Sequence, residues 1–547
     1  MTGGVSGPAL PRGRWIVSAT LVTRSAVHVG AGEPGETVDS PLARDATGGV
    51  LVSGEGVAGA LREALCALRL GYGVEESSDP ECMTGVVRLL GGRPGDDDGP
   101  QSRVVVHHAR CPAEAVEVRA GVELTAQRTA RPGHLYDAEV VPAGQRFDIR
   151  LDLDTDRRGD QGDDDPAELL ALLALALEGL EDGTVGLGAR ATRGWARCSV
   201  EAVRLWWFPL GDDRASWQRW LRLGLRPGNA PDPADGAAIV PVQGQRSAGA
   251  APVSPLAAGV ADGVARLAGD ALAEAVREHL DRLRGPRGDR RRSLRVAVEA
   301  TFASGLLVGG VTGGAEGPDA VHLLSGGKDV LPGTSLAGAL RAEAGRVAAR
   351  IAPSVAGEMV EALFGTASDG NDPRRGSPLV VDEVPLRGGT RVVGTRVRLD
   401  PFTGGSWTNG LFDEEVLHGA SGLMAVTLRL PWMEASSPAL PRWNALAGLT
   451  LRVMVQLARG RVALGGTVGV GRGTVLGTHL WISGVTPDGR ELEVDRALDG
   501  DGCFTDGQSG QPRPLLEETR HLLEGLVAAI PAAEPEPAAV AREDSDG

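Results

Sequence analysis

The chain has 547 residues, a length that predicts two to four domains, and 42% of its residues are hydrophobic while only 3% are aromatic. Its formal net charge of −16 argues against a freely acting nucleic-acid-binding protein but does not exclude a local arginine groove. No run of about 20 apolar residues predicts a membrane span, and the N-terminal residues lack the apolar core of a signal peptide, so we expect a cytoplasmic protein without membrane contacts.

A repeated stretch organises the whole chain. Residues 52–62 read "VSGEGVAGALR" and residues 331–341 read "LPGTSLAGALR", with glycines in register and the same last five letters. Each stretch combines a glycine turn with the start of an apolar-periodic segment, which predicts a helix. Because internal similarity at a long period indicates a duplicated structural unit, we expect one fold to occur twice.

The segments that follow each of these helices occur in the same order in both copies. A short apolar turn comes first, then a strand, then a hairpin segment containing "L-[YF]-D-[AE]-E-V", and finally an amphipathic helix with a glycine-rich loop. The turns span 86–92 and 360–366, the strands 102–111 and 377–386, and the hairpin segments 125–153 and 398–430.

Mixing antiparallel strands with two helices in this order is typical of the ferredoxin-like (RRM-like) class of α+β folds. Between the copies lies a Pro/Gly/Ala-rich linker with one predicted helix at 264–285. We therefore expect a flexible N-terminus (1–13), a first domain (14–206), a linker (207–293), a second domain (294–483), and a C-terminal helix with a disordered acidic tail (484–547).

Several short motifs, in the same order twice, resemble the RAMP superfamily of CRISPR-associated proteins, and most closely the backbone subunit of type III effector complexes. They are "VHVGAGE", "VDSPLARD" and "VSGEGVAGALR" in the first copy, "LPGTSLAGALR" in the second, and the hairpin sequences "GHLYDAEVVPAG" and "GLFDEEVLHGA". The resemblance implies a tandem fusion of two backbone subunits with thumb-like hairpins. Its partners would be guide (CRISPR) RNA, target single-stranded RNA and other effector subunits.

Two aspartates are the catalytic candidates that this resemblance implies. In the family, the aspartate of "D-S-P" cleaves target RNA with a divalent metal, which points to Asp39 as metal ligand and catalytic residue and to Mg²⁺ as the metal. The second copy offers Asp319 in "GPDAVHLL", without the following Ser-Pro. One carboxylate could hold Mg²⁺ and help to align a ribose 2′-hydroxyl for in-line attack. The alternative for each is a solvated or turn-capping side chain.

Arginines and helix starts are the candidates for RNA binding. Free N–H groups at a helix N-terminus bind phosphate, glycine loops expose backbone amides, and exposed hairpins can wedge between bases. The alternatives are tight turns, solvated arginines and ordinary hairpins. The predicted contacts are Gly54, Arg62, Arg128, Arg131, Arg190, Arg193, Gly333, Ser335, Arg341, Arg396, Arg398 and Arg472.

Four residues of the first copy are of types that can bind zinc: Cys82, His107, His108 and Cys111. Adjacent histidines on a strand point to opposite faces, and the second copy has no cysteine at all, so the pattern argues against zinc.

Three other functions compete with the RNA-cleaving backbone subunit. A catalytically inactive scaffold of the same complex would keep the RNA contacts alone. A guide-processing RAMP endoribonuclease needs a His/Tyr/Lys acid–base set, and the chain offers two tyrosines, Tyr72 and Tyr136, and one lysine, Lys328. A sugar-binding enzyme needs an aromatic-lined site, for which 3% aromatics are few.

Overall fold

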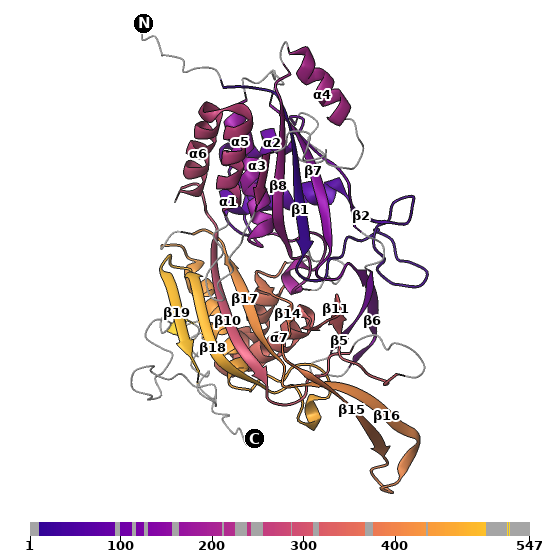
Figure 1. The fold of residues 1–547 in the computed structure, drawn as a ribbon. Coiled ribbons are helices and arrows are strands. Elements are labelled where there is room, and N and C mark those ends of the chain that lie inside the picture. The colour runs from indigo at the N-terminus through magenta and orange to yellow at the C-terminus, as the bar shows by residue number, and fades with distance from the viewer. Residues whose placement is uncertain are drawn as a thin grey trace, which may run out of the picture.

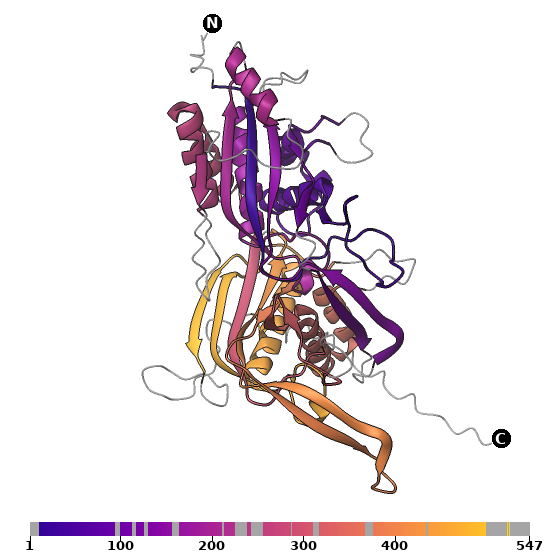
Figure 2. The same cartoon turned by 45° about the vertical axis from the view of Figure 1, so that its right-hand side comes forward.

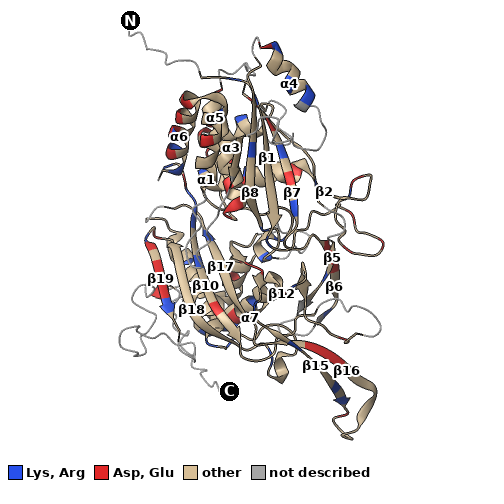
Figure 3. Cartoon of the chain, viewed as in Figure 1, with Lys and Arg blue, Asp and Glu red and all other residues tan. Residues whose placement is uncertain are grey.

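The computed structural model has two halves stacked along its long axis, the N-terminal half above the C-terminal half in Figure 1. Each half contains an antiparallel sheet, helices packed on the sheet, and a hairpin. Acidic and basic residues are interspersed over both halves (Figure 3). The structure describes residues 10–92, 99–111, 116–124, 130–155, 164–210, 213–224, 238–241, 255–285, 287–309, 317–366, 376–433, 436–498, 522, 524 and 525.

The two large sheets have matching strand orders. The first is β3-β7-β1-β8-β9 and the second is β13-β17-β10-β18-β19, with all neighbours antiparallel. The first contains β1 (Arg14–Thr23), β3 (Val104–Val106), β7 (Arg146–Asp154), β8 (Cys198–Phe208) and β9 (Ala238–Pro241). The second contains β10 (Arg292–Phe302), β13 (Leu379–Val381), β17 (Ser421–Leu430), β18 (Val475–Val485) and β19 (Glu491–Ala497). We call each sheet, with its helices and hairpin, the first and second repeat.

Alternation along the central strands builds the two cores. On β1, every second residue from Trp15 to Leu21 is buried against the helices, and on β10 the same holds from Leu294 to Ala300. Both central strands shift register against their neighbour at corresponding places, after Thr20 and after Glu299. The structure thus confirms an α+β fold with antiparallel sheets.

Three helices of each repeat correspond. In the first they are α1 (Gly54–Leu70), α2 (Pro80–Leu90) and α3 (Pro166–Glu181), and in the second α7 (Gly333–Ile351), α8 (Ala356–Phe364) and α9 (Leu440–Ala458). The predicted apolar turns at 86–92 and 360–366 are wrong, because most of each range lies in α2 or α8. Their apolar residues lie on the buried face of a helix, and each helix ends at a glycine with positive φ.

The linker contributes more than its predicted single helix. The expected helix at 264–285 is two helices, α5 (Leu256–Ala268) and α6 (Asp270–Arg284), because Gly269 between them has φ +94°. Both pack on α3, and β9 extends the first sheet. A further helix, α4 (Arg214–Gly224), packs on β8. The predicted C-terminal helix lies mostly outside the described residues.

A hairpin rises from each repeat, formed by β5 (Glu117–Leu124) with β6 (Ala130–Val140), and by β15 (Thr390–Leu399) with β16 (Ser406–His418). Both hairpins project on the same side of the molecule (Figures 1 and 2). The small strands are β2 (Val50–Val52), β4 (Ala109–Cys111), β11 (Leu324–Ser325), β12 (Lys328–Leu331) and β14 (Val384–Pro385). No helix in the described ranges is long and apolar enough to cross a membrane.

Buried ion pairs join the two repeats. Arg119 Nη1 on β5 donates to Glu383 Oε2 over 3.0 Å, and the two side chains are only 4% and 2% exposed. Asp382, the next residue, contacts Arg197 of the first repeat and Arg295 of the second at 3.1 Å each. Burial opposes the ionisation of Asp382, but the two guanidinium groups outweigh it and hold its pKa below the usual range. The relative position of the repeats therefore depends on charges paired across the junction.

Replacing Arg119 by Met should destabilise the protein in a pH-dependent way. Burial raises the pKa of Glu383, and loss of the Arg119 guanidinium would raise it further, so the ionised carboxylate is left uncompensated. At pH 8 we expect the free energy of unfolding to fall by about 3–5 kcal/mol. Near pH 5 protonation of Glu383 relieves part of this loss, because a raised folded pKa gives stability that disappears as pH rises. Denaturant titrations at the two pH values measure the difference.

The double variant Arg119→Met/Glu383→Gln is the control for this prediction. It has no carboxylate at position 383, so the additional loss at pH 8 that we expect for Arg119→Met should be absent from it. An equal deficit for Arg119→Met at pH 5 and pH 8 would contradict the argument.

Candidate nucleic-acid interface

Asp39 is held beside the first hairpin. It is an exposed residue in the loop between β1 and β2, and its Oδ2 accepts the N–H of Asp137 over 3.0 Å. Asp137 Oδ1 in turn accepts the N–H of Asp39 over 2.8 Å. A parallel bridge between Ser40 and Ala138 continues the contact. Because Asp137 belongs to the "LYDAEV" motif of β6, the loop carboxylate is fixed against the hairpin strand.

Asp319 takes the same position in the second repeat. Its Oδ2 accepts the N–H of Asp413 over 2.8 Å, and Asp413 is the aspartate of "LFDEEV" on β16. The parallel bridge between Ala320 and Glu414 is the counterpart of the bridge in the first repeat. The structure therefore places both predicted aspartates equivalently, even though Asp319 lacks the following Ser-Pro.

The chemistry of these carboxylates fits a divalent cation supplied together with RNA. Asp39 and Asp137 each use one oxygen for the partner's N–H, and no other contact within the described residues uses their second oxygens. In the second repeat, Asp413 Oδ1 is buried without a hydrogen-bond partner in the described part of the chain. Mg²⁺ is commonly held by one or two carboxylates, with water and substrate phosphate in its remaining positions. Among the described residues there is no group of three or more metal-ligating side chains.

The glycine-rich loop of the first repeat contacts the beginning of α7. Its short 3₁₀ helix, Ala191–Arg193, is followed by Gly194 with φ +88°. A Cβ on Gly194 would lie 2.8 Å from Gly333 Cα and 2.7 Å from the backbone nitrogen of Glu383. Only glycine fits at this distance from two backbones, so the loop of one repeat and the helix start of the other form one surface.

Three of the predicted arginines gather at this surface. Arg190 stacks on the rings of Tyr136 and Trp195, 4.4 and 4.7 Å from their centroids, and donates to Tyr136 Oη over 2.8 Å. Arg193 is exposed, and no side-chain hydrogen bond or ion pair links it to the described residues. Although Arg193 is exposed, protein atoms around its guanidinium displace part of the surrounding water, and this desolvation together with the nearby Arg341 guanidinium lowers the pKa of Arg193. This cluster of positive charges, in which Arg193 has no acidic partner among the described residues, is suited to binding an anion.

The corresponding loop of the second repeat differs. Its 3₁₀ helix, Val468–Val470, has Val470 where the first repeat has an arginine, and that valine is exposed. Arg472 is buried and contacts Glu414 at 2.7 Å, and Arg396 contacts the same carboxylate at 2.9 Å. The Arg472 side chain is therefore engaged in an internal ion-pair network.

Arg62 and Arg341 both bind the end of a neighbouring helix. Arg62 contacts Glu76 at 2.7 Å and donates to the carbonyl of Gly91 after α2 over 2.5 Å. Arg341 donates to the carbonyl of Gly365 after α8 over 3.3 Å. Carbonyl groups at a helix C-terminus lack intrahelical partners, so these contacts stabilise the fold without RNA. A phosphate contact by either arginine stays a prediction.

The two predicted helix starts are not equivalent. At α1, the Ser53 hydroxyl caps the helix and His108 Nδ1 accepts the Gly54 N–H over 2.9 Å. At α7, the preceding Pro332 offers no side-chain cap, and the Ser335 N–H donates to the Pro332 carbonyl over 3.0 Å. The first turn of α7, at the arginine cluster, is therefore the better anion site of the two.

The second hairpin exposes apolar side chains along its length. Every residue of β15 is exposed, Phe402 at the tip is 96% exposed, and Trp407 and Leu411 are also exposed. Arg398 lies 5.5 Å from the ring centroid of Phe412. Exposed aromatic and apolar groups on a finger can insert between stacked bases.

The first hairpin is partly covered by the second repeat. Glu117 Oε1 accepts the N–H of Gly326 over 2.9 Å, and Leu135 is 73% exposed near the far end. Arg131 lies exposed on β6. Arg128 lies outside the described residues.

The four residues weighed for zinc have separate contacts. His107 lies 3.2 Å from Asp152, His108 contacts the start of α1, and Cys82 Sγ donates to a backbone carbonyl. Burial raises the pKa of the Cys111 thiol to about 11, which disfavours the thiolate that zinc binds.

Sequence reasoning missed four residues that shape this interface: Asp137, Asp413, Trp195 and Glu414. The two aspartates occur at the same position of the duplicated "L-[YF]-D-[AE]-E-V" motif, which was their sequence signal. The motif does not predict which loop will form hydrogen bonds with its backbone. The stacking of Arg190 on Trp195 and the Arg472–Glu414 pair had no sequence signal, because they are tertiary contacts.

Comparison with known families gives two separate matches within the chain. A sequence model of the RAMP superfamily matches residues 20–199 and residues 299–474. The two regions begin in the last residues of the central strand and cover the carboxylate loop, the hairpin and the glycine-rich loop of each repeat. No curated protein matches the chain.

Alanine at Gly194 should be much more harmful than alanine at Gly471. Both glycines have nearly the same left-handed φ, +88° and +87°, so each substitution brings a backbone cost of about 1–2 kcal/mol. Only Gly194 faces neighbouring backbone, whereas a Cβ on Gly471 would meet nothing within 4 Å. We expect an additional loss of about 1–3 kcal/mol for Gly194→Ala in denaturant unfolding. Equal losses for the two variants would disprove the close contact between the repeats.

Proposed function

Because the chain belongs to the RAMP superfamily, which supports a CRISPR-associated RNA-binding role in general, we propose that it is a guide-RNA-binding backbone subunit of a type III CRISPR effector complex. It would cleave target RNA with a divalent metal at Asp39 and Asp319. The observation that carries the proposal is the duplicated geometry in which an exposed aspartate is held by the backbone of each hairpin. Other effector subunits would be its protein partners.

The fold supports this assignment through its strand order. In chain order the four main strands of the first repeat are β1, β3, β7 and β8, and their spatial order is second, third, first, fourth. That arrangement is consistent with a ferredoxin-like domain in each repeat, with the hairpin inserted as a thumb before the third strand.

Guide binding would use the arginine cluster at the junction. Arg193 and Arg341 crowd positive charge beside the uncapped start of α7, and Arg190 is held by two aromatic rings. Local clusters of this kind bind phosphate groups without requiring a basic protein overall, which is compatible with a net charge of −16.

Target cleavage would follow from the position of each aspartate beside its hairpin. Apolar side chains of a hairpin that enter the duplex would unstack bases and expose the adjoining phosphodiester. Asp39, with Asp137 beside it, and Asp319, with Asp413, would hold the metal through the oxygens that make no hydrogen bond within the described residues. When bound, the metal would stabilise the charge that develops on the reacting phosphate. The carboxylates themselves would orient the ribose 2′-hydroxyl for in-line attack.

An inactive scaffold is the second candidate, and one observation favours it. The described residues supply only pairs of carboxylates, so a bound metal depends on RNA for further ligands. The aspartate substitutions below distinguish the two functions.

Arg193→Ala should weaken binding of guide RNA and flatten its salt dependence. Loss of one phosphate contact to single-stranded RNA lowers the slope of log K against log salt by about 0.7. Filter binding over a salt series measures this slope. Arg222→Ala, an exposed arginine on the distant α4, is the matched control and should leave it unchanged. An unaltered slope for Arg193→Ala would count against the cluster.

Asp39→Asn should abolish one cut in target RNA within the assembled complex, and Asp319→Asn a second cut at a fixed distance. Asparagine retains an oxygen acceptor for the hairpin N–H but lacks the charge, so the loop should stay in place. We expect each cut to slow by at least about 100-fold, equal to about 2.7 kcal/mol, with target affinity unchanged.

Asp262→Asn, on the exposed face of α5, is the matched control for loss of one carboxylate. If neither Asp39→Asn nor Asp319→Asn alters the cleavage pattern with Mg²⁺ present, both repeats act as a scaffold and another subunit cuts.

A further inference from the structure

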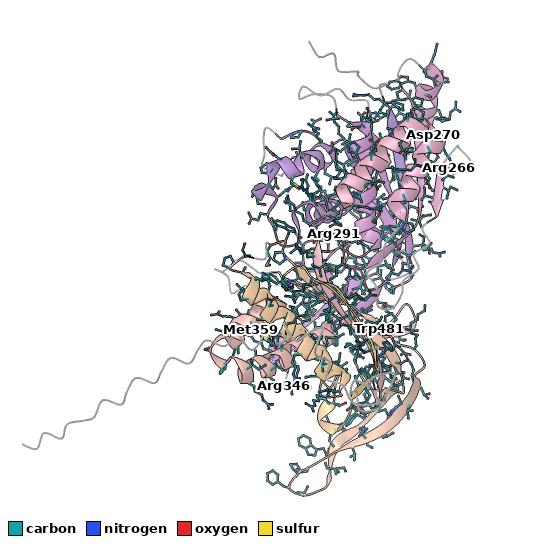
Figure 4. The ribbon with its side chains drawn as sticks, turned by 90° about the vertical axis from the view of Figure 1, so that its left-hand side faces the viewer. Arg266, Asp270, Arg291, Arg346, Met359 and Trp481 are labelled. Atoms are coloured by element: carbon teal, nitrogen blue, oxygen red, sulfur yellow. The ribbon has the colours of Figure 1, made fainter. Side chains whose placement is uncertain are left out.

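A basic pocket of about 290 Å³ lies between α7 and α9. Four arginines line it together with Glu343 and Gln456, and these are Arg346, Arg350, Arg452 and Arg461. Arg346 is neutralised by Glu343 at 2.6 Å, and Arg461 donates to the Gln456 amide over 3.4 Å. Within the described residues, no hydrogen bond or ion pair engages Arg350 or Arg452. Figure 4 labels Arg346 at the outer edge of the lower helical layer, away from the junction marked by Arg291.

At the corresponding place in the first repeat the two helices are in close contact, since a Cβ on Gly179 would lie 2.6 Å from Ala64 Cβ. Other parts of the chain cover the ends of α1 and α3 there. Arg291 contacts Asp182 at 3.1 Å, and Arg429 donates to the Thr184 carbonyl over 2.6 Å. A Cβ on Gly71 would lie 3.1 Å from the Arg290 carbonyl oxygen. The segment before β10 thus covers the helix ends and pairs Arg291 with the acidic Asp182, and Arg429 of β17 adds a contact to a backbone carbonyl.

The charge at this place is reversed in the second repeat. When α1 and α7 are aligned at their first residues, Arg350 is equivalent to Gly71. When α3 and α9 are aligned at their last residues, Arg459 is equivalent to Asp182 and Arg461 to Thr184. Arg459 Nε is buried and lacks a hydrogen-bond partner in the described part of the chain. An occupant of this pocket must therefore be acidic, and a second copy of the Arg290–Arg291 segment would be repelled.

The chain itself contains a suitable acidic segment within reach. Residues 531–547 carry five acidic residues and one arginine, a net charge of −4. Leu522 is buried in the second core, and a Cβ on Gly525 would lie 2.9 Å from Asn444 Cβ on α9. Asn444 and Arg452 are about 12 Å apart along that helix. The five residues 526–530 can span about 17 Å when extended, so the acidic segment can reach the pocket.

The order of elements after each sheet supports the same occupant. In the first repeat the chain adds β9 to the sheet, packs α5 and α6 on α3, and then covers the ends of α1 and α3 with Arg290 and Arg291. In the second repeat it adds β19 and then packs Leu522 and Gly525 near α9. We infer that the acidic C-terminal segment, residues 531–547, binds the arginine pocket between α7 and α9 and covers it in the free protein.

The test uses the full chain and a labelled peptide. A neutral-tail variant carries Glu534→Gln, Glu536→Gln, Glu543→Gln, Asp544→Asn and Asp546→Asn, and the probe is a fluorescein-labelled peptide of residues 531–547. By anisotropy, the peptide should bind the neutral-tail variant at least about tenfold more tightly than the unmodified chain. The reason is that a tethered competitor acts at millimolar effective concentration. Added salt should weaken the binding steeply.

Matched substitutions locate the binding site on the neutral-tail background. Arg350→Ala/Arg452→Ala should weaken peptide binding at least tenfold, whereas Arg214→Ala/Arg222→Ala, which removes the same charge from exposed positions of α4, should not. Arg350→Glu/Arg452→Glu should restore binding of a peptide whose acidic residues are replaced by lysine. Equal binding by the two alanine pairs would overturn the inference.

A second probe, labelled 12-nucleotide oligouridylate, distinguishes a nucleic-acid site. We expect its affinity to be the same for the two alanine pairs. If Arg350→Ala/Arg452→Ala weakens oligouridylate binding and leaves peptide binding unchanged, the pocket is an RNA site and the inference fails.

Discussion

The buried ion pair between Arg119 and Glu383 determines how the rest of the molecule is arranged. A guanidinium and a carboxylate removed from water are tolerated only with their partners in place, so the pair fixes the base of the first hairpin against the second repeat. With that distance set, the loop at Gly194 comes within backbone contact of Gly333. The arginine cluster exists because of this approach, since its members come from both repeats.

The two repeats share a fold but present different surfaces, and the junction explains why. In the first repeat the glycine loop, the hairpin base and the residues after α3 are all in contact with the second repeat. The same three places in the second repeat carry exposed Val470, an exposed hairpin and a pocket of arginines. The two repeats therefore have the same strand order but different residue types at equivalent positions, according to whether the position is covered or exposed.

The sequence predicted the duplicated order of elements well, because glycine turns, alternation and apolar helical spacing are local signals. The helix starts at Gly54 and Gly333 follow from these signals, whereas the first strand of each hairpin, β5 or most of β15, lies outside the predicted segments 125–153 and 398–430. Prediction failed where the secondary structure depends on tertiary packing. Residues 86–92 were predicted as a turn, but their apolar residues form the buried face of a helix. The sequence also did not predict the contacts of Arg62 and Arg472, because their partners are brought near only by folding.

The folding of the linker has a consequence for the spacing of the two repeats. Since α5 and α6 pack on α3 and β9 joins the first sheet, these described parts of the connection between the repeats are folded onto the first repeat. The distance between Asp39 and Asp319 then depends on packing within one folded chain. Because both aspartates belong to the same chain, their number and their order along the molecule are also fixed.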